Sequence, residues 1–192
     1  VGRMVLPTFM LSDSRNVGYA SHWLRAPQET YGFFFPTSFD GVQGVLRGAV
    51  GGFNLTTQLS AGTSKSDAYF FGPVGQADYK KIYSVNMLAE QGNWTFRLGY
   101  TAGADTEVTS SSQNEKGKDK FSGLGVQYDN GDLLVMSEYV TRRWTSKVNS
   151  ALDGVFDSDG YYVSAGYRFG SFMPYVTYSR YEPKGLAFTL QP

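Results

Sequence analysis

Strict alternation of apolar with polar or small residues, repeated along the chain, restricts the fold more than any other feature. Within residues 94–101 (WTFRLGYT) every second side chain is aromatic or apolar, and the same period of two recurs at 53–61 and 161–169. A helix would scatter these side chains around its axis, whereas a β-strand places them on one face. The periodicity therefore predicts an all-β fold from about residue 42 onward.

Short turns divide the strands into four hairpins. The full strands are expected near residues 42–50, 53–61, 80–91, 93–101, 120–129, 132–144, 160–169 and 171–181. The turns inside the hairpins are Gly51-Gly52, Gly92-Asn93, Asn130-Gly131 and Gly170-Ser171. Glycine and asparagine tolerate the positive φ that two-residue hairpin turns require. The connections between hairpins, 62–79, 102–119 and 145–158, are long and polar and are expected to be solvated loops.

Short turns at one end of the strands and long loops at the other are typical of transmembrane barrels of the bacterial outer membrane. Composition agrees, because 16% aromatic but only 41% hydrophobic residues suit strands with one apolar and one polar face. Aromatic residues such as Trp94 and Tyr100 lie toward strand ends, where they would meet lipid headgroups. We predict a transmembrane antiparallel up-and-down β-barrel. The alternative is a soluble β-sandwich or lipocalin-like barrel, whose inner face should be apolar.

The alternation also assigns charged side chains to the inner face of the barrel. If the aromatic face contacts lipid, the predicted pore-lining residues are Arg47, Arg97, Arg142, Arg168, Glu90 and Glu138. An arginine or lysine facing lipid at mid-membrane would cost about 2–4 kcal/mol. A row of inward charges cannot form a dry core without many partners. The interior is therefore predicted to be wet, and its excess of arginine predicts a weak preference for anions.

The first 41 residues differ from the rest of the chain. Residues 1–8 can form the end of a strand, with Pro7 near its rim. Residues 9–41 lack alternation and are too rich in aromatic residues for a disordered linker. A connection this long is usually functional, and inside a barrel the surface available for packing is the inner wall. We therefore expect residues 9–41 to fold inward.

The segment from Gly2 to Gly32 (GRMVLPTFMLSDSRNVGYASHWLRAPQETYG), together with the hairpin series, resembles Gram-negative porins of the large trimeric type. In pattern the resemblance covers essentially the whole chain. It implies a homotrimer that passes small hydrophilic solutes across the bacterial outer membrane, and a third extracellular loop that narrows the channel. It also implies candidate constriction residues, Asp13, Arg15, His22, Arg25 and Glu29. Opposed to basic wall residues, they would set a transverse field that filters solutes by charge; local pairing or solvation is the alternative.

The strand count bears on whether the barrel is complete. A partial strand at 1–8 and eight further strands give about nine, whereas porins of this type have sixteen and bacterial barrels have an even number. We therefore expect residues 1–192 to be one β-barrel domain that is incomplete at both ends. The alternative is a complete eight-stranded barrel that leaves the opening segment out of its wall.

Other chemistries have little support in the sequence. The chain has no cysteine and a net charge of zero, which argues against thiolate metal sites and a nucleic-acid partner. No cofactor or metal is expected, and the single histidine, His22, supports catalysis only weakly. We therefore expect a protein that is not an enzyme; a plugged structural or adhesive barrel and a lipid-acting barrel enzyme are the alternatives. Lysines at 80–81 and 116–120 are expected to contact outer-membrane lipopolysaccharide or solvent alone.

Overall fold

The computed structural model describes residues 1–12, 26–32, 36–69, 74–109, 114–148 and 153–185. Within them lie one short helix, α1 (Gln28–Tyr31), and nine strands: β1 (Gly2–Val5), β2 (Ser38–Val50), β3 (Phe53–Tyr69), β4 (Val74–Gln91), β5 (Trp94–Thr109), β6 (Asn114–Asp129), β7 (Leu133–Ser146), β8 (Ser158–Tyr167) and β9 (Tyr175–Pro183). The strands form one sheet in chain order, and every neighbouring pair is antiparallel. The predicted all-β up-and-down fold and the number of strands are confirmed. No helix in the described residues is long and apolar enough to cross a membrane.

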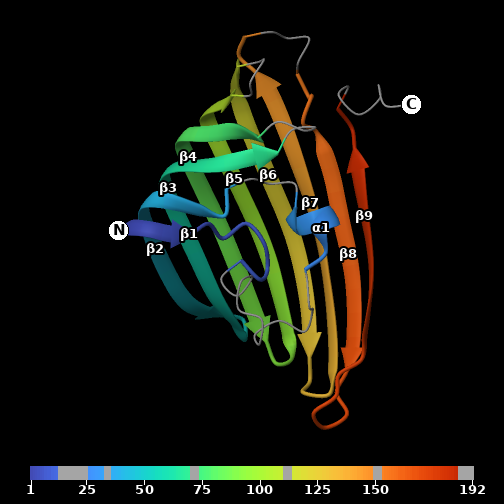
Figure 1. Ribbon diagram of the computed structural model, residues 1–192. Coiled ribbons are helices and arrows are strands. Elements are labelled where there is room, and N and C mark those ends of the chain that lie inside the picture. The colour runs from blue at the N-terminus through green and yellow to red at the C-terminus, as the bar shows by residue number, and fades with distance from the viewer. Residues whose placement is uncertain (13–25, 33–35, 70–73, 110–113, 149–152, 186–192) are drawn as a thin grey trace, which may run out of the picture.

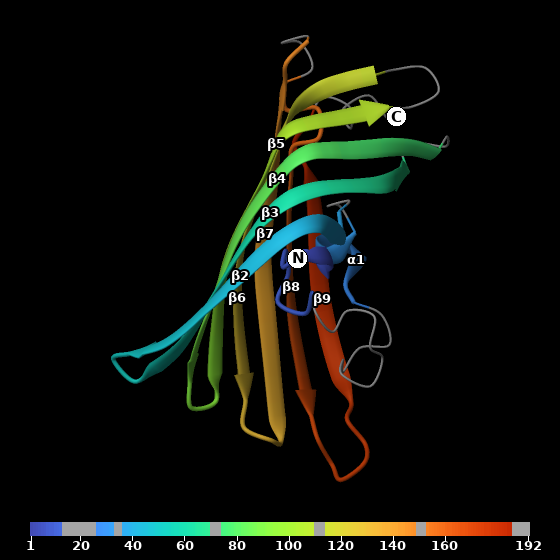
Figure 2. The ribbon, with the colours of Figure 1, turned by 90° about the vertical axis from the view of Figure 1, so that its left-hand side faces the viewer.

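The sheet is strongly curved, with β1 and β9 at its two edges (Figure 1). The helix α1 lies on its concave side (Figure 2). We call the concave face the inner wall and the convex face the outer wall. The described residues do not form the alternative closed eight-stranded barrel, because β1 belongs to the sheet and pairs with β2 from Gly2↔Gly41 to Val5↔Ser38.

The two walls differ in the side chains that they carry. Along β7 every second residue from Leu134 to Trp144 is buried, and these residues face the inner wall. The outer wall carries exposed apolar side chains on successive strands, including Leu46, Leu59, Val85, Leu98, Leu124, Val163 and Val176. A continuous apolar surface of this kind marks contact with a membrane or another protein. The period of two in the sequence thus separates an apolar outer wall from a more polar inner one.

Four strands extend into segments for which the sequence predicts loops. Residues 62–79 and 102–119 are strand for most of their length, so the loop prediction is wrong there. These segments look like loops because they are polar, but their charged side chains pair across strands, as in Lys65–Asp78, Lys80–Glu107 and Lys116–Glu107. Opposite charges on neighbouring strands favour pairing of those strands in a sheet. Hydrophilic composition alone does not distinguish such strands from loops.

Glu107 belongs to two of these three pairs and lies at the loop-side end of the sheet, beyond the apolar part of the outer wall. Hydrogen bonds from Lys80 and Asn114, with the attraction of Lys116, lower the pKa of Glu107 to about 2. Because this pKa is depressed, the carboxylate is charged at neutral pH, and its pairing is lost only as the pH falls toward that value.

The loop-side ends of β3, β4 and β5 bend toward the inner side, above α1 (Figure 2). The strand register shifts between Gly62 and Ser64 in β3, between Tyr79 and Ile82 in β4, and between Gly103 and Thr106 in β5. The three irregularities are adjacent across the sheet, since Gly62 and Gly103 both pair with Ile82. A β-bulge bends its strand and increases its twist, so their alignment accounts for the bend.

The bend predicts a position-specific need for glycine. Gly41 and Gly62 are directly paired, and a Cβ at Gly62 would come closer than 3.0 Å to the Asp40 carbonyl oxygen. We predict that Gly62→Ala lowers the free energy of unfolding by about 1–3 kcal/mol, the usual cost of overpacking, in a denaturant titration in detergent. Gly48→Ala is the matched control, because a Cβ at Gly48 meets nothing within 4 Å. Equal effects of the two substitutions would contradict this explanation.

Candidate functional site

One row of directly paired residues crosses the inner wall from β5 to β8. Arg97 pairs with Gly125, Gly125 with Glu138, and Glu138 with Tyr162. Directly paired residues project from the same face of a sheet, so all of these side chains point inward. Gly125 has no side chain, and the resulting gap lets Arg97 approach Glu138 until Nη1 and Oε2 are 3.9 Å apart.

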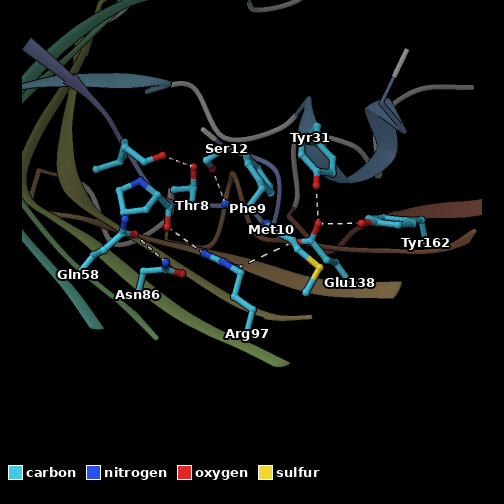
Figure 3. Close-up of polar contacts among 12 residues, drawn as sticks. Thr8, Phe9, Met10, Ser12, Tyr31, Gln58, Asn86, Arg97, Glu138 and Tyr162 are labelled. Carbon is cyan, nitrogen blue, oxygen red and sulfur yellow. Dashed lines mark hydrogen bonds and ion pairs between the residues drawn. The ribbon is translucent and has the colours of Figure 1, made fainter. Parts of the chain in front are cut away.

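Glu138 holds two separate pieces of the N-terminal region against this row (Figure 3). Its Oε2 accepts a hydrogen bond from the backbone N–H of Met10 at 2.9 Å, and its Oε1 accepts bonds from the hydroxyls of Tyr31 at 2.5 Å and Tyr162 at 2.8 Å. Met10 precedes α1 and Tyr31 lies in it, whereas Tyr162 belongs to β8. We call residues 6–12 together with α1 the anchored segment. A single carboxylate on β7 therefore fastens the anchored segment to the wall.

Arg97 makes a second attachment. Its Nη2 donates a hydrogen bond to the carbonyl oxygen of Pro7 at 2.9 Å. Arg97 is only 2% exposed and Glu138 only 1%. A buried charge is strongly unfavourable unless it is paired and hydrogen-bonded. Because the anchored segment both covers these two charges and bonds to them, the wall and the segment depend on each other.

Three glycines make room for these contacts on the wall. Gly99 and Gly123 are directly paired, and a Cβ at Gly99 would come closer than 3.0 Å to the guanidinium of Arg97. A Cβ at Gly123 would lie 3.0 Å from Arg97 Nη1, and one at Gly125 would lie 3.2 Å from Met10 Cε. We call Gly99, Gly123 and Gly125 the glycine strip. It lets the Arg97 side chain lie along the sheet and lets the anchored segment approach it.

Aromatic packing completes the attachment. The Phe9 ring stacks on Tyr31 with centroids 4.5 Å apart and meets the edge of Phe121 at 5.2 Å. Tyr31 also lies 6.1 Å from Tyr162. Phe9, Tyr31 and Phe121 are fully buried. Each aromatic pair of this kind contributes about 0.5–1.5 kcal/mol beyond its buried area, so the segment is held by packing as well as by charge.

A second buried ion pair lies on the inner wall nearer the bend. Arg142 donates from Nε and Nη2 to Asp119 at 3.0 and 2.7 Å, and the Tyr79 hydroxyl donates to the same carboxylate at 2.8 Å. The guanidinium also stands over the Phe156 ring, 5.3 Å from its centroid. Arg142 is 3% exposed. This cluster is a paired, buried part of the wall.

Two predicted pore-lining residues remain open on the inner wall. Arg47 pairs with Thr56, Thr56 with Leu88, and Leu88 with Arg97, so Arg47 shares the inner face. Glu90 follows Leu88 by two residues and lies on the same face. Both side chains are exposed, and neither makes an ion pair with the residues that the structure describes.

The structure places the other predicted wall residues differently. Arg97, Arg142 and Glu138 face inward but are covered, because the anchored segment or a buried partner occupies the space before them. They bind parts of the protein to each other and do not line open water. Arg168 lies beside a hairpin turn and forms an ion pair of 2.9 Å with Asp129.

Most of the predicted constriction residues lie outside the described residues. This applies to Asp13, Arg15, His22 and Arg25. Glu29 is in the first turn of α1 and partly exposed. The helix lies against β7, β8 and β9, so α1 lies on the inner wall. Residues 38–41 of the predicted inward segment instead belong to β2 and form part of the wall itself.

Sequence reasoning does not identify Tyr31, Tyr162, Asp119 or the glycine strip. Tyr31 and Tyr162 are separated from Glu138 by long stretches of chain, and no local pattern connects them. The glycine strip leaves a readable signal, because the alternation puts Gly99, Gly123 and Gly125 on one face of adjacent strands. Three glycines at neighbouring inner positions indicate a place where another segment of the chain packs against the wall.

The described residues offer no arrangement of three or more histidine, cysteine, aspartate or glutamate side chains that could hold a metal ion. The acidic side chains of the loop before β8 hold the backbone at the end of β7. Asp153 and Asp157 accept hydrogen bonds from the backbone N–H groups of Ser146 and Trp144, both at 2.7 Å.

Comparisons with known proteins give one structural likeness to report. The chain is similar to OmpTdeltaL8, a loop L8 deletion mutant of OmpT, an outer membrane protein of Vibrio cholerae. The TM-score is 0.43 and the identity 14%, and the match covers 94% of this chain and 68% of that chain. No family model matches the sequence, and no curated protein matches it.

The attachment at Glu138 predicts a large effect of its removal. We expect Glu138→Ala to lower the free energy of unfolding by about 3–5 kcal/mol, since it leaves Arg97 buried without its carboxylate. We also expect chymotrypsin to cleave the folded protein after Phe9 or Tyr31, which are buried in the native protein. Glu90→Ala, which removes an exposed carboxylate from the same wall, is the control. If Glu138→Ala left both stability and protease resistance unchanged, the anchoring role would be disproved.

Proposed function

We propose that this chain forms the wall of a water-filled channel that passes small hydrophilic solutes across the bacterial outer membrane, with the anchored segment narrowing its lumen. The observation that carries the proposal is the difference between the two faces of one sheet. The outer wall is apolar and exposed, whereas the inner wall keeps Arg47, Glu90 and many amides and hydroxyls. This arrangement suits lipid outside and water inside.

Two belts of aromatic side chains on the outer wall support a membrane location. One lies beside the hairpin turns and includes Phe53, Trp94, Phe96, Tyr128, Tyr167 and Phe169. The other, Tyr83, Tyr100, Tyr139 and Tyr161, lies eight or nine residues from the nearest turn glycine, Gly92, Gly131 or Gly170. Strands rise about 3.3 Å per residue, so this spacing suits tilted strands that cross an apolar band about 25 Å tall.

Charged residues on the outer wall lie outside the apolar band that the two aromatic belts enclose. On the outer wall of the described strands, Lys81, Lys120, Arg143 and Arg180 all lie at or beyond the level of the second belt. Basic side chains within the band would cost about 2–4 kcal/mol each at its centre. The distribution of charge therefore supports the boundary that the tyrosines suggest.

Polar side chains on β2 to β5 support a wet interior. The Gln43 amide donates to Ser60 Oγ at 3.2 Å, and the Asn86 amide donates to Gln58 Oε1 at 2.9 Å. Gln58 keeps part of its surface open, and so does Thr56. A chain of amides and hydroxyls on an open wall is favourable when water satisfies the remaining donors and acceptors.

The structure changes the expected charge selectivity. The sequence predicts a weak anion preference from inward arginines, but Arg97 and Arg142 are buried beside Glu138 and Asp119. Arg168 is also paired, with Asp129. The open wall residues Arg47 and Glu90 balance each other in charge. We therefore propose a channel with little charge selectivity in the described part of its wall.

The anchored segment also favours a second candidate, a plugged structural or adhesive barrel. It covers the inner wall from β5 to β9, and a larger inward structure could close the lumen. Uptake of small sugars into liposomes distinguishes the two, because a plugged barrel would exclude them. A lipid-acting enzyme would depend on His22, which lies outside the described residues. Trimeric assembly is proposed from the family resemblance.

Bilayer recordings test the channel proposal. We expect the purified full-length protein to give discrete conductance steps in planar bilayers, with a reversal potential near zero in a KCl gradient. Arg47→Glu should shift the reversal potential toward cation selectivity, because it reverses an exposed charge in the lumen. Arg180→Glu, on the outer wall as the direct partner of Tyr161, is the control and should not. The absence of steps would disprove the proposal, and an unmoved potential for Arg47→Glu would remove that residue from the lumen.

A further inference from the structure

An apolar groove of about 440 Å³ opens on the outer wall at the base of the bend. Its apolar lining consists of Val42, Leu59, Ala61, Tyr83, Val85 and Tyr100. This volume is within the range of about 300–1,000 Å³ that is typical of small-molecule sites. The groove lies at the level of the tyrosine belt, so in the proposed channel it would face the boundary between acyl chains and headgroups.

Small residues between large ones create the groove. Ala61 pairs with Val42 on one side and Tyr83 on the other, so a methyl group stands between two larger side chains. The next residue, Gly62, is the glycine at which β2 and β3 approach too closely for a Cβ. The groove therefore reflects the small side chain of Ala61 on the outer face, next to the row of bulges that bends the sheet.

Two basic side chains border the groove, Lys120 to its side across Ala102 and Lys81 toward the loops. Tyr83 pairs with Ala102, and Ala102 pairs with Lys120. Because neighbouring strands lie about 4.8 Å apart, Lys120 is roughly 10 Å from Tyr83 at the backbone, with only the small Ala102 between them. Lys81 follows on the same face of β4 as Tyr83, toward the loops.

These two lysines are available for a ligand. Lys81 and Lys120 are exposed, and neither forms an ion pair with the residues that the structure describes. The nearest carboxylate across from Lys81 is Asp105, which is already paired with Lys147 at 3.0 Å. The space above Ala102 therefore lies between the positive charges of Lys81 and Lys120. The nearby carboxylate, Asp105, is already neutralised by Lys147.

We propose that this groove binds one acyl chain of an anionic, phosphate-bearing membrane lipid, whose phosphate lies above Ala102 between Lys81 and Lys120. The proposal rests on the proposed function in one respect, the placement of the outer wall against lipid. Charge complementarity and continuity with the apolar outer wall favour a lipid over a peptide. The main-chain groups of β3 and β4 are already paired on both sides, so an added strand would find no partners there.

Lipid retention in detergent tests the proposal. The purified protein, in a zwitterionic detergent, is titrated with dimyristoyl phosphatidylglycerol or dimyristoyl phosphatidylcholine, and retained lipid is counted by native mass spectrometry. We expect selective retention of phosphatidylglycerol. Ala61→Trp should abolish it by filling the groove. The double substitution Lys81→Ser and Lys120→Ser should weaken it about tenfold or more, since each basic residue near an anionic headgroup contributes about 1 kcal/mol.

Matched variants separate these effects from general damage. Ala165→Trp places the same side chain on the outer wall, between Val135 and Val176 and far from the groove. Lys65→Ser with Lys116→Ser removes two other exposed lysines from the same sheet. Both controls should retain phosphatidylglycerol as the native protein does. Equal retention of the two lipids would overturn the proposal, and so would retention that Ala61→Trp leaves intact. Displacement of the lipid by inorganic phosphate alone would show a simple anion site, and would overturn it too.

The experiment distinguishes this proposal from the channel proposal. Retention is measured on the protein in detergent and requires no conductance. Ala61→Trp lies on the outer wall and should leave conductance unchanged. A protein that retains the lipid but does not conduct would disprove the channel proposal alone, and the reverse result would disprove the lipid site alone.

Discussion

The buried carboxylate of Glu138 is the interaction on which the rest of this structure depends. It lies on the inner wall of a sheet whose opposite face is apolar, and it is accompanied by an equally buried arginine, Arg97. Neither charge is stable there without partners. Met10, Tyr31 and Tyr162 give the carboxylate its hydrogen bonds, and Pro7 accepts one from the arginine. The anchored segment both buries these charges and supplies most of their hydrogen bonds, so the segment and the charged wall depend on each other.

The glycines of the sheet show how a regular strand pattern produces an irregular shape. On β5 and β6 they leave a shallow strip that accepts the anchored segment. At the paired positions Gly41 and Gly62 they allow two backbones to approach, next to the row of bulges that bends β3 to β5. The apolar groove on the outer wall surrounds Ala61, the small residue paired with Val42 and Tyr83. Glycines therefore contribute both to the packing on the inner wall and to the close approach of β2 and β3 beside the bend.

The sequence predicts the larger features of this protein well, for a physical reason. A period of two determines which side chains share a face, so the strands, the hairpin turns and the inward direction of Arg97 and Glu138 can all be predicted locally. The segment that covers those residues cannot be predicted in this way. The bond from Met10 to Glu138 joins residues 128 positions apart, and no periodicity encodes it. The strand ends near Lys65 and Glu107 are missed for a different reason, since polar strands that protrude from an apolar band have the composition of loops.

The central claim is that the inner wall faces water while the outer wall faces lipid, and substituted-cysteine accessibility tests it most directly. The chain contains no cysteine, so each introduced thiol reports one position. Thr95→Cys and Gln127→Cys lie on the inner wall as direct partners, whereas Phe96→Cys and Leu98→Cys lie on the outer wall of the same strand. In planar bilayers, we predict that a charged, membrane-impermeant thiol reagent reacts with the inner pair and lowers the conductance, and leaves the outer pair unmodified. Equal modification of both pairs, or modification of the outer pair alone, would contradict the claim.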